Sequence, residues 1–151
     1  MIYSASHIAK WFLAYNRSIM NESDADTISN LKLQKLLYYA QGIFLGFNDG
    51  IPLFEDPIVA WTHGPVVESV YHEYKGYGST GIDFDETFDF ASVEIEDHNL
   101  LIEVYNNFSQ YSAWKLRDMT HKERPWIETM RCEEIPKSLI KDFFLEEYIK
   151  Q

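Results

Sequence analysis

The stretch that decides the fold is Ser29–Phe47, with the sequence Ser-Asn-Leu-Lys-Leu-Gln-Lys-Leu-Leu-Tyr-Tyr-Ala-Gln-Gly-Ile-Phe-Leu-Gly-Phe. Ser29 or Asn30 can cap the free N–H groups of a first helical turn. The apolar residues that follow recur at the helical period and are Leu33, Leu36, Leu37, Ala40, Phe44 and Phe47. Gly42 and Gly46 each destabilise a helix interior by roughly 1 kcal/mol relative to alanine, so we expect another backbone to pass close to them. The pattern predicts one long, central helix.

The overall composition predicts one folded domain over residues 1–151. Hydrophobic residues make up 46% of the chain and aromatic residues 16%, which argues for a hydrophobic core and against disorder. No apolar run approaches the ~18 residues that suggest a membrane span, and the N-terminus lacks the pattern of a signal peptide. The single cysteine, Cys132, excludes an internal disulfide and a cysteine-built zinc site. We therefore expect a cytoplasmic protein that does not contact membranes.

The net charge of −11 is concentrated in the middle of the chain. Residues 54–103 carry twelve acidic side chains and one basic side chain, Lys75, whereas residues 1–53 and 104–151 are each balanced. A surface of that sign repels nucleic-acid phosphates and favours a basic partner. Four acidic residues alternate with three phenylalanines between positions 83 and 90, which predicts acidic groups that steer a partner and exposed phenylalanines that anchor it. The alternative is a solvated acidic surface with no partner.

The rest of the chain is predicted to form further helices with short connections. A first helix is predicted from Ser4 or Ser6 to about Ile19. The segment 58–61 is a candidate short strand, and Pro65 is placed at the first position of a helix that ends near Lys75. Later helices are predicted over about 97–110 and 113–119, and from Pro125 and Pro136 onward. The predicted fold class is mainly α, a compact single-domain helical globule of six to seven helices with room for a small β-sheet.

Patterns that carry chemistry in other proteins lack their usual context here. Gly76-x-Gly78-x-x-Gly81 has the letters of a dinucleotide-binding loop, but it ends a predicted helix and leads into an acidic run. His63, His72 and His121 do not have a standard metal-ligand spacing. Cys132 lies beside carboxylates that would raise a thiol pKa. The only sizeable basic run, residues 115–124, contains acidic residues as well and does not form a basic recognition helix.

Several segments together resemble one known family. Asn-Leu-Lys-Leu-Gln-Lys-Leu-Leu-Tyr-Tyr-Ala-Gln-Gly at 30–42, Ala-Trp-Thr-His-Gly-Pro-Val-Val at 60–67 and Val-Tyr-His-Glu-Tyr-Lys-Gly-Tyr-Gly at 70–78 look like the Panacea domain. That domain occurs in SocA-like antitoxins and in GepA-like phage-associated proteins. Leu-Arg-Asp-Met-Thr-His at 116–121, followed by Pro125-Trp126, is similar to the family's C-terminal signature. The resemblance covers about residues 4–146.

The resemblance implies an antitoxin that neutralises a cognate toxin by direct protein–protein binding, with no cofactor and no enzymatic activity. We expect the toxin to have a basic surface, and we expect no metal and no direct contact with nucleic acid. One alternative is a proteolytic adaptor that delivers a toxin to a protease. Another is a small metal-dependent hydrolase that uses His63, His72 and His121. Whether the free protein is a homodimer is left open.

Two groups of residues are candidates for binding the partner. The first consists of motif residues with polar tips or aromatic rings, types enriched at binding hot spots: Lys32, Lys35, Tyr38, Gln41, Trp61 and Tyr71. The second comes from the acidic segment: Asp83, Phe84, Asp85, Glu86, Phe88 and Asp89. The motif residues, together with Gln34, His121 and Trp126, fit a buried hydrogen-bond network around the central helix equally well.

Overall fold

The structure is a computed structural model that describes residues 2–20, 26–83 and 87–149. In these residues the chain forms seven α-helices, two short 3₁₀-helices and one two-stranded sheet. The elements are α1 (Ala5–Met20), α2 (Asn30–Phe47), β1 (Val59–Trp61), β2 (Gly64–Val66), α3 (Glu68–Tyr74), η1 (Lys75–Tyr77), η2 (Phe90–Ser92), α4 (Ile95–Phe108), α5 (Ala113–Thr120), α6 (Arg124–Ile127) and α7 (Lys137–Glu147). The predicted mainly helical class and the small sheet are confirmed.

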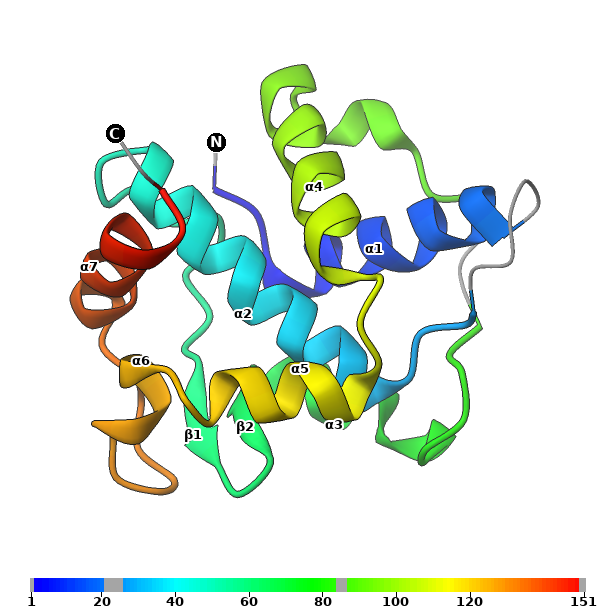
Figure 1. Ribbon diagram of the computed structural model, residues 1–151. Helices are drawn as coiled ribbons and strands as arrows, with labels where there is room; N and C mark the ends of the chain where they lie inside the picture. Colours follow the sequence, from blue (N-terminus) through cyan, green and yellow to red (C-terminus); the bar gives the residue numbers. More distant parts are fainter. Residues whose placement is uncertain (1, 21–25, 84–86, 150–151) are drawn as a thin grey trace.

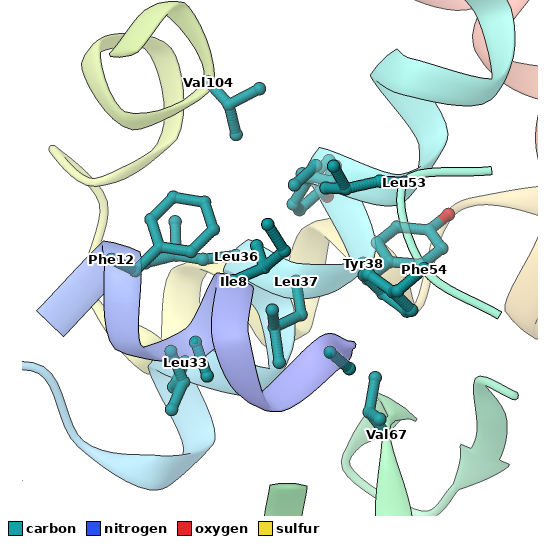
Figure 2. Packing of buried hydrophobic residues seen from close by; sticks show 14 of the residues in the cluster. Ile8, Phe12, Leu33, Leu36, Leu37, Tyr38, Leu53, Phe54, Val67 and Val104 are labelled. Atoms are coloured by element: carbon teal, nitrogen blue, oxygen red, sulfur yellow. The ribbon is translucent and has the colours of Figure 1, made fainter. Parts of the chain in front are cut away.

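Helix α2 is the centre of the fold, as its sequence predicts. Ser29 caps it, because its hydroxyl oxygen accepts a 3.3 Å hydrogen bond from the Lys32 N–H. The helix packs against α1, α4, α5 and α7, which surround it in Figure 1. Figure 2 shows its apolar side chains meeting those of α1, α4 and the segment after α2. Phe47 does not belong to this buried stripe, because the helix ends there and 59% of the side chain is exposed.

The chain after β1 folds back as a hairpin, so the prediction that Pro65 begins a helix is wrong. Pro65 lies in β2 opposite Ala60, and α3 begins three residues later, at Glu68. A proline, which has no N–H, is tolerated there because both backbone hydrogen bonds of Ala60 point away from Pro65: the Ala60 N–H donates to the Glu133 carbonyl at 3.0 Å. The Cys132 N–H donates in turn to the Ala60 carbonyl at 2.7 Å, so the segment 132–133 lies along β1.

The glycines of α2 mark a close approach, but to side chains rather than to a backbone. A Cβ atom on Gly42 would overlap the ring of Phe144 in α7, and one on Gly46 would overlap Ile149. Phe144 is fully buried and stacks at 5.0 Å on Tyr148. The two glycines therefore let the C-terminal helix lie close against α2. Among the described residues, no helix combines the length and the apolar character needed to cross a membrane.

Candidate partner-binding site

The polar residues of α2 point inward and hold the hairpin and α3 in place. The Gln34 side-chain oxygen accepts a 2.9 Å hydrogen bond from the Val67 N–H, and its amide nitrogen donates to the Asn30 side-chain oxygen at 3.0 Å. Asn30 donates in turn to the carbonyl oxygen of Tyr71 at 3.1 Å. All of these amide groups are buried. One face of α2 is thus bonded to the connection between β2 and α3.

Lys35 and Gln41 continue this internal bonding along the helix. The Lys35 ammonium donates to the Pro65 carbonyl oxygen at 2.9 Å, and the side chain is fully buried. Burial, followed by the nearby charge of Arg117, lowers the pKa of Lys35 to about 7. Gln41 accepts from the Leu53 N–H at 2.8 Å and donates to the Phe54 carbonyl at 2.7 Å. Neither side chain is available to a partner in this conformation.

A buried carboxylate with three tyrosine hydroxyls lies on the α7 side of α2. Tyr38 and Tyr39 donate to the two oxygens of Glu123, each at 3.0 Å, and Tyr148 donates at 2.5 Å. Burial raises the pKa of Glu123 to about 7, against the lowering effect of these hydrogen bonds. In the sequence, Glu123 is one of the acidic residues within the basic run 115–124. A single acidic residue has no periodic pattern, so no sequence signal singled it out.

The alternative interpretation, a buried network, therefore describes three of the six motif candidates: Lys35, Tyr38 and Gln41. Lys32 is half-buried and donates from its ammonium to the Ser109 carbonyl at 2.6 Å. Burial lowers the pKa of Lys32. The remaining two, Trp61 and Tyr71, are partly exposed and pack edge to face with ring centroids 4.8 Å apart.

Trp61 and Tyr71 form part of a cavity of about 520 Å³, which we call the hairpin cavity. The start of α2, the hairpin, α3, the loop after it and α5 contribute to its walls, together with the 131–132 segment. In Figure 1 the hairpin, α3 and α5 lie along the lower side of the molecule, below α2. The lining residues are Asn30, Leu31, Gln34, Trp61, Thr62, His63, Val66, Tyr71, Lys75, Gly78, Ser79, Trp114, Arg131 and Cys132. None of the described residues that line it carries a carboxylate.

A stack of aromatic and cationic groups supports one wall of the hairpin cavity. The Arg131 guanidinium lies 3.7 Å from the ring centroid of Trp126 and donates to the Trp126 carbonyl at 3.0 Å. The indole N–H of Trp126 donates to the Trp61 carbonyl at 2.8 Å, and its other face stacks on His121 at 3.9 Å. Trp126 therefore joins α6 to the hairpin.

The histidines of the metal-dependent alternative lie near this face but do not form a ligand set. His63 accepts a 3.2 Å hydrogen bond from Arg117 and packs against Trp114, while His72 packs against Trp61. Burial lowers the pKa of His121, and the nearby charges of Arg117 and Lys35 lower it further. In the part of the chain that the structure describes, no three His, Cys, Asp or Glu side chains gather where they could hold a metal ion.

The acidic segment is only partly described. Phe84, Asp85 and Glu86 lie outside the described residues, and Asp83 is exposed. Asp89 is exposed and caps η2 by accepting from the Ala91 N–H at 2.9 Å. Phe88 is not the exposed anchor that the sequence predicts, because it is half-buried against His7 and Phe90.

The fold is a small, mainly helical one with an open, largely apolar cavity beside its hairpin. The model of the family described as "Antitoxin SocA-like, Panacea domain" matches residues 33–127, and the chain belongs to that family. The chain is also 49% identical over 51 residues to the protein named Antitoxin SocA from Caulobacter vibrioides (strain NA1000 / CB15N). That alignment covers 34% of this chain and 27% of the relative, so the chain spans only a small part of the relative's length. No solved structure matches significantly.

Proposed function

We propose that this protein neutralises a cognate toxin by direct protein–protein binding and that the hairpin cavity and its rim form the contact surface. Membership of the SocA-like antitoxin family supports an antitoxin role. The observation that carries the proposed contact is the division of the motif residues. Lys35 and Gln34 are buried and bond to the hairpin and the residue after it, whereas Trp61 and Tyr71 line an open cavity. The protein then needs no catalysis, and we expect it to act in the cytoplasm.

Coexpression with the product of a short reading frame in the same operon, taken as the toxin, tests the proposal. We expect growth to be rescued, a stable complex to copurify and the amount of toxin to stay unchanged. Tyr71→Ala should weaken both the complex and the rescue, because it removes a ring that lines the cavity. The variant should still fold, because among the described residues Tyr71 forms hydrogen bonds through its backbone. Tyr111→Ala is the matched control, a half-buried tyrosine that lines a different cavity between α4 and α5. Rescue with loss of the toxin would indicate a proteolytic adaptor, and the absence of both complex and rescue would refute the proposal.

The acidic middle of the chain supports a second part of the proposal, that the toxin has a basic surface. Several of these acids are engaged within the protein. Glu73 pairs with Lys10 at 2.9 Å, and Asp97 accepts from the Tyr3 hydroxyl at 2.7 Å. Asp83 and Asp89 are exposed. Asp89 precedes α4, and in Figure 1 helix α4 lies on the opposite side of α2 from the hairpin. Carboxylates outside the contact act mainly on the rate of association.

Association kinetics test this part separately. The double variant Asp83→Asn, Asp89→Asn should slow association and flatten its dependence on salt, and the asparagine at 89 can still cap η2. The double variant Asp142→Asn, Glu147→Gln removes the same charge from exposed positions of α7 and is the control. Equal association rates for the two double variants at low salt would show that the acidic segment is only a solvated surface.

A further inference from the structure

We propose that the hairpin cavity receives a bulky apolar side chain of the toxin together with a neighbouring carboxylate. The docking segment of the toxin would then carry an aromatic or large aliphatic residue next to Asp or Glu. This inference rests on the proposed function and specifies what the cavity binds. Three observations lead to it: the charge of the lining, its apolar walls and the state of its hydrogen-bonding groups.

The charge of the lining is opposite to that of the protein. Lys75 and Arg131 line the cavity, whereas the chain as a whole has a net charge of −11. Neither cation forms an ion pair with any described residue. Arg131 is also held in place by the Trp126 ring and carbonyl, which leaves other guanidinium N–H groups for an acceptor. Two uncompensated cations, of which Arg131 is held in place, are complementary to a carboxylate.

The walls of the cavity are apolar and aromatic. Trp61, Tyr71 and Trp114 line it together with Leu31 and Val66. Trp114 is 58% exposed, so much of its ring is left to be covered by a partner. Arginine and large aromatic residues around a pocket are the side chains that dominate binding energy at protein interfaces. A cavity of about 520 Å³ has room for a large side chain and part of its neighbour.

The two amide side chains of the cavity favour a side chain over a nucleotide as its occupant. The amides of Gln34 and Asn30 line the cavity, but their hydrogen bonds run to Val67, to each other and to the Tyr71 carbonyl. A nucleobase is recognised by hydrogen bonds to its edge as well as by stacking. With these amides engaged internally, the cavity offers shape, aromatic surface and positive charge at its rim. An acidic and apolar peptide segment uses all three.

Cys132 allows a direct test, because it lines the cavity, is exposed and is the only cysteine of the chain. The toxin should slow alkylation of Cys132 by N-ethylmaleimide roughly tenfold. Prior labelling of Cys132 with fluorescein maleimide should weaken toxin binding by at least about tenfold, which corresponds to ~1.4 kcal/mol. The double variant Cys132→Ser, Ser138→Cys carries the same label on α7, outside the cavity, and should bind the toxin like the unlabelled protein.

Charge reversal tests the carboxylate. Arg131→Glu and Lys75→Glu should each weaken toxin binding by about tenfold or more, because like charges would face each other at the rim of the cavity. Lys141→Glu makes the same change on α7 and should have little effect. Arg131→Glu also removes the contact with Trp126. The deciding measurement is therefore whether a compensating charge change in the toxin restores binding. A toxin whose docking acid is changed to lysine should regain affinity for Arg131→Glu and lose it for the wild type.

The outcomes separate this inference from the proposed function. If the wild type binds and neutralises the toxin while Cys132 stays equally reactive and charge reversal has no effect, the cavity is not the docking site and only this inference fails. If the wild type binds no toxin, both fail. Protection of Cys132 by AMP or inorganic phosphate without toxin would overturn the inference in favour of a small-anion site. Protection that appears only with self-association of the protein would overturn it in favour of a dimer contact.

Discussion

The ammonium group of Lys35 donates a 2.9 Å hydrogen bond to the carbonyl oxygen of Pro65, which joins the centre of α2 to the second strand of the hairpin. No carboxylate forms an ion pair with this lysine among the described residues, and its side chain has no solvent exposure. Two motifs that lie thirty residues apart in the sequence are thus the two halves of one buried contact. Because Lys35 is ionisable, the dependence of stability on pH tests this contact.

Lys35 should make the protein more stable as the pH rises from about 7 to about 10.5. In that range the folded state binds fewer protons at Lys35 than the unfolded state, because burial lowers the pKa from 10.5 to about 7. The contribution is complete above 10.5 and is lost as the pH falls through about 7. Lys35→Met should lack this rise of stability with pH, whereas Lys141→Met, at a half-buried position of α7, should keep it. Urea unfolding at pH 7, 8 and 9 measures the difference, and parallel curves for the two variants would contradict it.

Glu123 should act in the opposite direction at lower pH. Burial raises its pKa from 4.5 to about 7, so between these values the folded state binds more protons than the unfolded state. The contribution of Glu123 to the free energy of unfolding is therefore greatest below about pH 4.5. It falls as the pH rises through about 7, by at most about 3 kcal/mol. Glu123→Gln should flatten this dependence, and Glu134→Gln, an exposed carboxylate, should not. Chemical denaturation between pH 4.5 and 7.5 decides the matter; an unchanged slope in Glu123→Gln would assign the pH dependence to other groups.

Gly64→Ala should destabilise the fold by roughly 1–3 kcal/mol or more. Gly64 has a φ of +109°, and a Cβ atom there would lie 2.8 Å from both the Lys35 Cε and the Thr120 hydroxyl oxygen. The substitution therefore strains the turn and pushes against the Lys35 contact. Gly76→Ala is the matched control, since a Cβ atom at that position meets nothing within 4 Å. The free energies of unfolding of the two variants should differ clearly, and equal values would mean that the hairpin turn can relax.

Leu36→Asp should unfold the protein or destabilise it by several kcal/mol, because it buries an unpaired carboxylate in the core that Figure 2 shows. Phe47→Asp, at the exposed end of the same helix, should have a small effect. If Leu36→Asp cannot be purified, Leu36→Ala should still lower the free energy of unfolding by about 2–5 kcal/mol. Thermal melting and urea denaturation compare the three variants. A Leu36→Ala protein as stable as the wild type would refute the assignment of the buried face.

The sequence by itself determined the helices, the central place of α2 and the family. These follow from local patterns: the Ser29 cap and the recurrence of Leu33, Leu36 and Leu37 depend only on the geometry of one helix. The family motifs are also linear, so they could be recognised before the fold was known. The candidate site was predicted in part, because Trp61 and Tyr71 were among its residues and do line the cavity.

The tertiary structure alone decided which polar groups face inward and where the cavity lies. Lys35, Tyr38 and Gln41 have polar ends that suit a surface, yet each is buried because a segment distant in sequence supplies its hydrogen-bond partner. Helical periodicity says which residues share a side of α2, but it does not say that the hairpin, α5 and α7 cover the other sides. The cavity likewise combines Trp61 with Arg131, seventy residues later. Only folding brings such residues together, because the free energy of burying a polar or charged group depends on neighbours that the local sequence does not contain.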